Sequence, residues 1–324
     1  MNHQDVVAVT SRSFSNNDFL VHELKKLYSN VLLNDSGKTL KGIELIEFLK
    51  DANKAIIGIE KISDSDLSKL PKLRVISKYG VGLNNLDLEA LKTRNIKLGF
   101  TPGVNKQSVA EHALTLMLAG LKKIQNNNVD ILSGNWSQEK GSELFGKTVG
   151  LLGFGNIGQK LASLIQPFSC KIIFFDKQDY TNEDIFKISR DLNLNPELID
   201  QLPLDIVLSQ SDIISIHLPL FKDTRNIISS KELDLLKSTI CIINTSRGGI
   251  INEDHLHRFL LENSTAFAGF DVYEVEPAFS NPLLKLTNFF GTSHRSSLTL
   301  EGINAMGIAA INGLDDNINP KQYI

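Results

Sequence analysis

A glycine-rich turn in the middle of the sequence has a form that holds dinucleotide phosphates. Its residues are Gly153-Phe154-Gly155-Asn156-Ile157-Gly158, and they directly follow the apolar run 148–152. In such a turn the first glycine permits a tight bend, the second lets backbone approach a pyrophosphate, and the third allows close helix packing. The N–H groups at the helix start then face the phosphates. The motif is weak alone, but the strand before it and the Leu- and Ala-rich segment after it favour a dinucleotide site over a structural turn.

An acidic residue ends the next apolar run. Asp176 follows the run 171–175 and stands 18 positions after Gly158. A carboxylate at this point accepts hydrogen bonds from the ribose hydroxyls and repels a 2′-phosphate. The sequence therefore predicts NAD rather than NADP as cofactor, although the flexible ammonium of Lys177 could partly compensate a phosphate.

An arginine, a carboxylate and a histidine follow three later strand-like runs. They are Arg247 in the block 244–249, Glu276 in the block 271–277 and His294 in the block 291–294. Ligands of open parallel sheets bind beyond the carboxyl ends of the strands, so all three are expected near one site. Arginine binds a carboxylate or polarises a carbonyl, histidine moves a proton, and the carboxylate fixes the imidazole tautomer and favours its charged form. In isolation, the arginine reads as a surface turn residue and the histidine as a strand-edge residue.

Short β-branched runs alternate with segments of helical period along almost the whole chain. Strands are expected at 6–9, 31–33, 55–59, 73–76, 96–98, 148–152, 171–175, 212–216, 239–243, 266–272 and 288–290, and helices at 18–28, 40–50, 86–93 and 106–125. This alternation predicts an α/β fold with two doubly wound parallel-sheet domains. The polar stretch 177–203 is expected to be an irregular surface excursion of the second domain.

The composition excludes several classes of protein. The 324 residues are 42% hydrophobic and 22% charged with a formal net charge of −3, which is typical of a globular protein and supplies no basic field for nucleic acid. The longest nearly uncharged apolar stretch, 112–121, is too short to span a membrane, and the first residues do not have the order of a signal peptide. We therefore expect a cytoplasmic protein without a membrane partner. Cys170 and Cys241 lack metal or CxxC spacing, so buried free thiols and no metal site are expected.

Together these motifs resemble the D-isomer-specific 2-hydroxyacid dehydrogenase family, particularly its phosphoglycerate dehydrogenase-like branch. The resemblance covers residues 70–300 and rests on ordered blocks at 78–87, 101–103 and 108–111, the glycine turn, His217-Leu218-Pro219-Leu220 and the three blocks above. It implies that Arg247 holds the substrate's carboxylate and carbonyl, that His294 is the acid/base and that Glu276 is its partner.

The resemblance also implies which other residues bind the substrate and which bind the cofactor. Those expected to bind substrate are Lys78, Gly80, Val81 and Gly82, and those expected to bind NAD are His217 and Pro219 at the adenine side and Thr245 and Asp271 at the nicotinamide end. The expected architecture is a Rossmann-type NAD domain, 102–293, inserted into a discontinuous flavodoxin-like substrate domain, 1–101 plus 294–324. The resemblance further implies a homodimer formed through the cofactor domain.

The sequence departs from the family pattern at the substrate end. Lys78 stands where the branch commonly has arginine, Ser293 replaces a proline, and Arg295 follows the histidine where an aliphatic residue is usual. The predicted function is NAD-dependent interconversion of a D-2-hydroxyacid and its 2-oxoacid, with 3-phosphoglycerate and phosphohydroxypyruvate as the leading pair. A glyoxylate or hydroxypyruvate reductase is the alternative within this chemistry. A dinucleotide-sensing interaction protein, like the co-repressors that resemble the family, is the alternative outside it.

Overall fold

The computed structural model describes residues 4–323, and the chain divides into two units. The first unit combines the residues up to Asn105 with those from Leu298 onward, and the second is Lys106–Ser297. Both boundaries fall four residues after the ones expected from the sequence, which brings His294 into the second unit. Each unit has its own sheet and its own hydrophobic cores.

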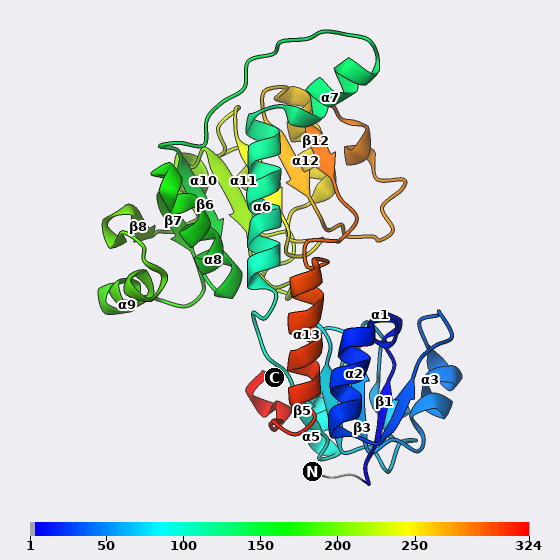
Figure 1. Cartoon of the computed structure of the whole chain (residues 1–324). Coiled ribbons are helices and arrows are strands. Elements are labelled where there is room, and N and C mark those ends of the chain that lie inside the picture. The colour runs from blue at the N-terminus through cyan, green and yellow to red at the C-terminus, as the bar shows by residue number, and fades with distance from the viewer. Residues whose placement is uncertain (1–3, 324) are drawn as a thin grey trace. The chain divides into compact units, whose positions relative to one another are not determined.

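The first unit is built on a five-stranded sheet in which every neighbouring pair is parallel. Its elements are β1 (Val6–Val9), α1 (Arg12–Ser15), α2 (Asp18–Leu27), β2 (Asn30–Leu33), α3 (Gly42–Leu49), β3 (Lys54–Ile57), α4 (Asp64–Leu67), β4 (Val75–Lys78), α5 (Leu88–Thr93), β5 (Lys97–Gly99), α13 (Leu300–Asn312) and the 3₁₀ turn η4 (Pro320–Tyr323). The strand order β2-β1-β3-β4-β5 is the flavodoxin-like order, as predicted. Figure 1 shows α13, in red, beside the blue α2, so the two ends of the chain build one unit.

Strand periodicity divides the core of the first unit between two faces of the sheet. Val7 and Val9 of β1 pack with Leu20 and Leu24 of α2, whereas Ala8 between them belongs to the cluster on the other face. Successive side chains of a strand point to opposite faces, so a wholly apolar strand is buried on both.

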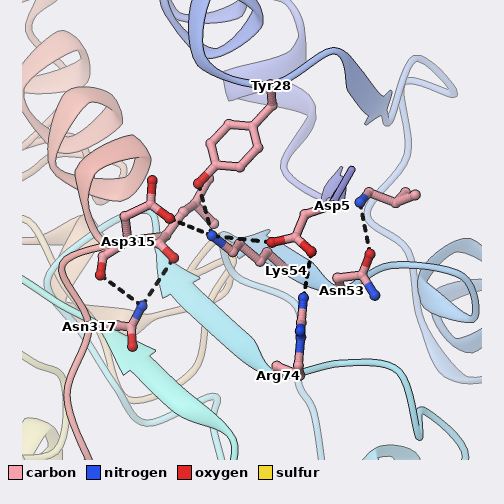
Figure 2. Close-up of polar contacts among 9 residues, drawn as sticks. Asp5, Tyr28, Asn53, Lys54, Arg74, Asp315 and Asn317 are labelled. Carbon is pink, nitrogen blue, oxygen red and sulfur yellow. Dashed lines mark hydrogen bonds and ion pairs between the residues drawn. The ribbon is translucent and has the colours of Figure 1, made fainter. Parts of the chain in front are cut away.

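A cluster of charged side chains lies at the amino ends of three strands of this sheet (Figure 2). The Lys54 ammonium, at the start of β3, lies 2.5 Å from a carboxylate oxygen of Asp315 and 3.5 Å from one of Asp5, and donates to the Tyr28 hydroxyl at 3.1 Å. The Arg74 guanidinium contacts the other oxygen of Asp5 at 2.5 Å. We call these five residues the Lys54 cluster. Ligands of such sheets bind at the carboxyl ends of the strands. The Lys54 cluster lies at the opposite edge.

The second unit is built on a seven-stranded sheet that is also parallel throughout. Its elements are α6 (Lys106–Leu121), α7 (Ile124–Leu132), β6 (Thr148–Leu152), α8 (Asn156–Ile165), η1 (Gln166–Phe168), β7 (Lys171–Phe175), α9 (Asn182–Leu192), η2 (Pro196–Leu198), β8 (Ile199–Gln201), α10 (Leu204–Gln210), β9 (Ile213–Ile216), α11 (Ser230–Leu233), β10 (Cys241–Asn244), α12 (Glu253–Glu262), β11 (Phe267–Phe270), η3 (Pro282–Lys285) and β12 (Phe289–Gly291). The order β12-β11-β10-β9-β6-β7-β8 contains the predicted Rossmann order and reverses direction between β6 and β9.

Two segments differ from the sequence-based prediction. The stretch 177–203 is not irregular, because it contains α9 and the edge strand β8, which pairs with β7. β8 escapes a pattern search because it is three residues long, and Ile199 is its single apolar residue. The expected helix 106–125 ends at Leu121, where Lys123 takes a left-handed conformation (φ 51°) before α7 begins.

The two cysteines are buried free thiols, as predicted. Burial raises the pKa of Cys170 to about 11 and that of Cys241 to about 12, so both stay protonated at neutral pH. Within residues 4–323, every helix is too short or too polar to span a bilayer.

Candidate functional site

The glycine turn joins β6 to α8 and has the geometry that a bound pyrophosphate requires. Gly153 has φ +97°, and a Cβ there would lie 2.8 Å from the His217 carbonyl oxygen. A Cβ on Gly158 would lie 2.3 Å from the Gly153 carbonyl oxygen, so only glycine lets α8 pack this closely on the turn. A Cβ on Gly155 would meet nothing within 4 Å, which leaves open space over the turn. The start of α8, Asn156 and Ile157, has no side-chain cap. Its N–H groups are available to an anion.

Asp176 follows β7 and lies against this turn. One of its carboxylate oxygens accepts the N–H of Phe154 at 2.7 Å, and the other accepts that of Gln178 at 3.0 Å. Tyr180 also contacts this turn: its hydroxyl donates to the Phe154 carbonyl at 3.2 Å, and its ring packs edge-on against that of Phe154. The start of the 177–203 stretch therefore forms part of the wall around Asp176, and Lys177 is exposed.

Unpaired polar atoms line the carboxyl ends of two neighbouring strands. His217 follows β9, and both nitrogens of its imidazole are buried without a hydrogen-bond partner in the described part of the chain. Burial lowers the pKa of His217 to about 3, so the ring is neutral. The hydroxyl oxygen of Thr245, after β10, is also buried and unpaired there. Pro219 is exposed two residues beyond His217.

These atoms fit a bound dinucleotide. Buried polar groups normally have partners, so unpaired ones at the same sheet edge as the glycine turn and the Asp176 carboxylate are suited to a polar ligand. The glycine turn and the uncapped start of α8 would hold the pyrophosphate, and Asp176 would accept the ribose hydroxyls. His217 and Thr245 would supply further polar contacts along the same edge.

Arg247 lies three residues after the end of β10. Its guanidinium donates to the Ser246 carbonyl at 2.6 Å, and the side chain is half-buried. Burial lowers the pKa of Arg247, and the negative charge of Glu276 opposes that shift. A Cβ on Gly248 would lie 1.9 Å from the carbonyl carbon of Tyr273, so the backbone after Arg247 lies directly against the loop that carries Glu276.

His294 and Glu276 form a hydrogen-bonded pair. The distance from His294 Nδ1 to Glu276 Oε2 is 2.8 Å, and the other oxygen of Glu276 accepts the N–H of Tyr273 at 3.0 Å. The carboxylate is thereby fixed in direction. The His294 side chain is 47% exposed, so its Nε2 edge remains accessible.

Asp271 lies under the loop that carries His294. It is fully buried, and its carboxylate accepts the N–H groups of Arg295 and Ser296, both at 2.8 Å. The Thr292 hydroxyl donates to the same carboxylate at 2.5 Å. The structure thus gives Asp271 contacts to the histidine loop that the sequence did not indicate. Its contact with the nicotinamide end of the cofactor stays a prediction.

The remaining predicted residues belong to the first unit. Lys78 is the last residue of β4, is 7% exposed, and donates from its ammonium to the Gly58 carbonyl. The turn that follows contains Gly80, with φ +122°, then Val81 and Gly82. Lys78 and this turn therefore lie together at the carboxyl end of one strand.

Two contributors to the site were not predicted. His112 lies on α6, and its imidazole is hydrogen-bonded to the Thr292 hydroxyl, 180 positions away in the sequence. The ring of Tyr180 lies in the stretch that was expected to be irregular. Neither contact could be predicted from the local sequence pattern, because each joins two segments that come together only in the folded sheet.

Comparison with known proteins identifies the family. The sequence model for "D-isomer specific 2-hydroxyacid dehydrogenase, NAD binding domain" matches residues 114–296. The chain is 34% identical over 302 residues to a hydroxypyruvate reductase of Thermotoga maritima, and the match covers 91% of this chain and 94% of that protein.

Two further similarities agree. A D-3-phosphoglycerate dehydrogenase of Methanocaldococcus jannaschii is 35% identical over 267 residues, which are 82% of this chain but 49% of that longer protein. The solved glyoxylate reductase of Paecilomyes thermophila has a TM-score of 0.81 at 25% identity and covers 95% of this chain and 93% of its own. The chain therefore belongs to the D-isomer specific 2-hydroxyacid dehydrogenase family, whose members are NAD-dependent oxidoreductases acting on CH–OH donors, and it carries the family's NAD-binding domain.

Proposed function

We propose that the chain interconverts a small polar D-2-hydroxyacid and its 2-oxoacid, with His294 as the proton carrier. The observation that carries this proposal is the bond from His294 Nδ1 to Glu276 Oε2 at 2.8 Å. An ionised carboxylate only accepts hydrogen bonds, so Nδ1 of the histidine is the donor. The neutral imidazole then has its lone pair on Nε2, at the accessible edge of the ring.

The two directions of the reaction need opposite states of His294. During oxidation, Nε2 accepts the proton of the substrate hydroxyl, and Glu276 stabilises the imidazolium that forms. During reduction, the protonated Nε2 donates to the carbonyl oxygen of the 2-oxoacid. The cofactor held by the glycine turn and Asp176 would supply the redox chemistry: NAD⁺ would take the hydride from the substrate's C2 in oxidation, and NADH would return it in reduction.

Arg247 has a separate task in this proposal. Its guanidinium would bind the substrate carboxylate and polarise the carbonyl oxygen, as a planar cation with several donors can. Because the group is half-buried, its charge is weakly screened. The carboxylate of Glu276 compensates that charge when no substrate is bound.

For the substrate, the position of Lys78 favours an unphosphorylated acid. As a cation among the residues expected to bind substrate, Lys78 is the group that could bind a distal phosphate, but its ammonium is buried against the Gly58 carbonyl. Hydroxypyruvate and glyoxylate, named in the two relatives that match almost end to end, are therefore our first candidates. Phosphohydroxypyruvate is the second, supported by the 35% identity to a D-3-phosphoglycerate dehydrogenase.

A panel of 2-oxoacids tests the function. NADH oxidation is followed with hydroxypyruvate, glyoxylate, phosphohydroxypyruvate, pyruvate and a branched 2-oxoacid. We expect the highest kcat/KM for one of the first two. No turnover with any acid, combined with intact NADH binding, would contradict an enzymatic role and support the dinucleotide-sensing alternative.

Lys78→Ala separates the two substrate candidates. If Lys78 binds a phosphate, the variant raises KM for phosphohydroxypyruvate much more than for hydroxypyruvate. If its ammonium only donates a hydrogen bond to the Gly58 carbonyl, the KM values for phosphohydroxypyruvate and hydroxypyruvate change by the same factor. Lys72→Ala, which removes an exposed lysine of the same unit, is the matched control.

The proposal includes a homodimer formed through the second unit. On α7 and the segment after it, large apolar side chains are exposed by half or more: Ile124, Val129, Ile131, Leu132, Trp136 and Phe145. No residue of α7 is buried within the chain. An apolar patch of this kind marks an interface, and a second copy of the chain is the partner that the family resemblance implies.

Trp136 is the only tryptophan and reports directly on this interface. We expect twice the monomer mass by light scattering. Leu132→Asp is expected to yield a monomer whose tryptophan emission is shifted to the red. Leu261→Asp changes an exposed leucine elsewhere in the unit and is expected to leave the dimer intact.

The cytoplasmic location remains part of the proposal. Two free, buried cysteines fit a reducing compartment. Fractionation of the native cells, with an antibody to the chain, tests the location.

A further inference from the structure

A hydrogen-bonded chain connects α6 to the loop of His294. His112 lies on α6, and its Nε2 is 3.0 Å from the Thr292 hydroxyl oxygen. That hydroxyl lies 2.5 Å from Oδ1 of Asp271, which is fully buried. His112 itself is 19% exposed and lies 3.7 Å from the same carboxylate oxygen. All three residues belong to the second unit.

The direction of each hydrogen bond follows from the available hydrogens. Thr292 has one hydroxyl hydrogen, and the carboxylate of Asp271 accepts only. The alternative acceptor, the Phe270 carbonyl, is 3.5 Å away, so the hydrogen goes to Asp271. His112 must therefore donate from Nε2 to the oxygen of Thr292. Burial, assisted by Arg295 and opposed by Asp271, lowers the pKa of His112 and so favours the neutral ring. The hydrogen bond to Thr292 places the hydrogen of that ring on Nε2.

Asp271 transmits this arrangement to the backbone around His294. The N–H of His294 donates to the Asp271 carbonyl at 2.8 Å, and the next two N–H groups, of Arg295 and Ser296, donate to its carboxylate at 2.8 Å. His294 has φ +51°, in the left-handed region that non-glycine residues rarely adopt. Three hydrogen bonds to one residue hold that conformation, and it directs the imidazole toward Glu276.

We propose that His112 is a positioning residue for His294, acting through Thr292 and Asp271; this inference rests on the proposed role of His294. His112 Nε2–H orients the Thr292 hydroxyl, and that hydroxyl fixes the rotation of the Asp271 carboxylate. The carboxylate in turn fixes the backbone that carries the acid/base. Without the His112 hydrogen bond, the Thr292 hydroxyl can turn toward the Phe270 carbonyl, which leaves Oδ1 of Asp271 with the Arg295 N–H as its hydrogen-bond donor.

Matched variants separate this role from packing. His112→Leu removes the donor, whereas His112→Gln keeps an amide N–H near the position of Nε2. Thr292→Val removes the hydroxyl with little change of shape, and Thr292→Ser keeps it. The rate of NADH oxidation is measured in single turnovers with the best 2-oxoacid of the panel, and the NADH Kd is measured by fluorescence.

We expect His112→Leu and Thr292→Val each to lower the single-turnover rate about 10-fold, because small displacements of a catalytic group are costly. NADH Kd is expected to stay within about 2-fold, and His112→Gln and Thr292→Ser to retain most of the rate. The double variant, His112→Leu with Thr292→Val, is expected to be no slower than Thr292→Val alone, since residues acting in one chain are not additive.

Hydrogen exchange supplies a readout that needs no turnover. The amides of Arg295 and Ser296 should exchange faster in His112→Leu and Thr292→Val than in the wild type, and at the wild-type rate in His112→Gln. The proposal is overturned if His112→Leu keeps the wild-type rate and exchange, or if His112→Gln behaves as His112→Leu does. If His294→Ala keeps full turnover, the proposed function itself is wrong. A loss in His294→Ala with a normal rate in His112→Leu overturns the positioning role alone.

Discussion

The Lys54 cluster of the first unit and the carboxyl edge of the sheet in the second unit are both rich in polar groups, but they differ in how these are paired. In the Lys54 cluster two cations face two carboxylates, and the Tyr28 hydroxyl accepts a further hydrogen of Lys54 (Figure 2). Among the residues that the structure describes, Oδ2 of Asp5 accepts no hydrogen bond, but the Lys54 ammonium lies 3.5 Å from it. At the carboxyl edge, both nitrogens of His217 and the hydroxyl oxygen of Thr245 are buried without a partner in residues 4–323.

From this difference we infer that the Lys54 cluster contributes to stability and the carboxyl edge to function. A buried polar group without a partner costs free energy, and a ligand at the carboxyl edge would supply the hydrogen bonds that His217 and Thr245 lack. In the Lys54 cluster the two cations balance the two carboxylates. The ion pair between Lys54 and Asp315 links the segment near the end of the chain to the sheet. We therefore expect substitutions in the cluster to change the free energy of unfolding, and those at the carboxyl edge to change catalysis or cofactor binding.

The largest effect is expected for His294→Ala. Removing a positioned acid/base should lower kcat by on the order of 10²- to 10⁴-fold. The NADH Kd and the free energy of unfolding should stay near wild type, because His294 is half exposed. Single-turnover kinetics, fluorescence titration and urea unfolding measure the three quantities. Wild-type turnover in a step limited by chemistry would contradict the assignment.

Lys54→Met tests the other region. The variant keeps the apolar stem of the side chain but leaves the buried carboxylate of Asp5 without its lysine, and breaking a buried pair costs about 3 kcal/mol. Urea unfolding should show this loss, while kcat of the folded protein stays unchanged. Lys72→Met, in an ion pair whose lysine is 58% exposed, should cost less than about 0.5 kcal/mol. A lower kcat of Lys54→Met with an unchanged free energy of unfolding would contradict the assignment of the Lys54 cluster to stability.

Cofactor preference should follow from the charge of Asp176. Close repulsion between this carboxylate and a 2′-phosphate costs about 2 kcal/mol, so kcat/KM should favour NADH over NADPH by roughly 30-fold. Asp176→Asn should reduce the ratio while retaining an acceptor for the Phe154 N–H. Lys177→Ala, at the neighbouring exposed residue, serves as the control. Equal use of NADPH by the wild type would instead assign Lys177 to the phosphate.

Glu276→Gln should have a smaller effect than loss of the histidine. The amide oxygen can still accept the Nδ1 hydrogen of His294, so part of the rate should remain, about 10-fold below wild type. Without the negative charge the imidazolium is less stable, and the pH profile for reduction should move to lower pH. Steady-state rates of reduction and oxidation across pH should also have opposite slopes. An unchanged profile would show that the carboxylate does not assist the proton transfer.

The smallest effect concerns Asp315 in acid. Burial raises its pKa, but hydrogen bonds from Lys54 and Tyr28 outweigh this and lower it. A lowered carboxyl pKa stabilises the fold above the unfolded value of about 3.9, and this stability is lost as pH falls through the folded value. The side chain is 68% exposed, so screening should keep the contribution below about 1 kcal/mol. Asp315→Asn should therefore be less stable than wild type at pH 6, and the difference in free energy of unfolding should shrink as pH falls below about 3.9, as a series of urea unfolding curves will show.

Much of the fold was predictable because it depends on local patterns. The apolar runs at 6–9, 148–152 and 171–175 became strands with the expected bounds, since strands buried on both faces must be apolar throughout. β8 and α7 were missed for complementary reasons. The edge strand β8 takes its stability from pairing with β7, and α7 has no buried residue to give it a strong pattern.

The sequence by itself determined the glycine turn, Asp176 and the pairing of a histidine with a carboxylate, because spacing after a strand fixes where such residues emerge. Only the tertiary structure decided which groups support them. His112 and Thr292 are 180 positions apart, and their contact exists because α6 packs on β11. Likewise, the burial of Lys78 against Gly58 and of both nitrogens of His217 depends on neighbouring strands. Pairing and burial are properties of surroundings that folding assembles, so no local pattern encodes them.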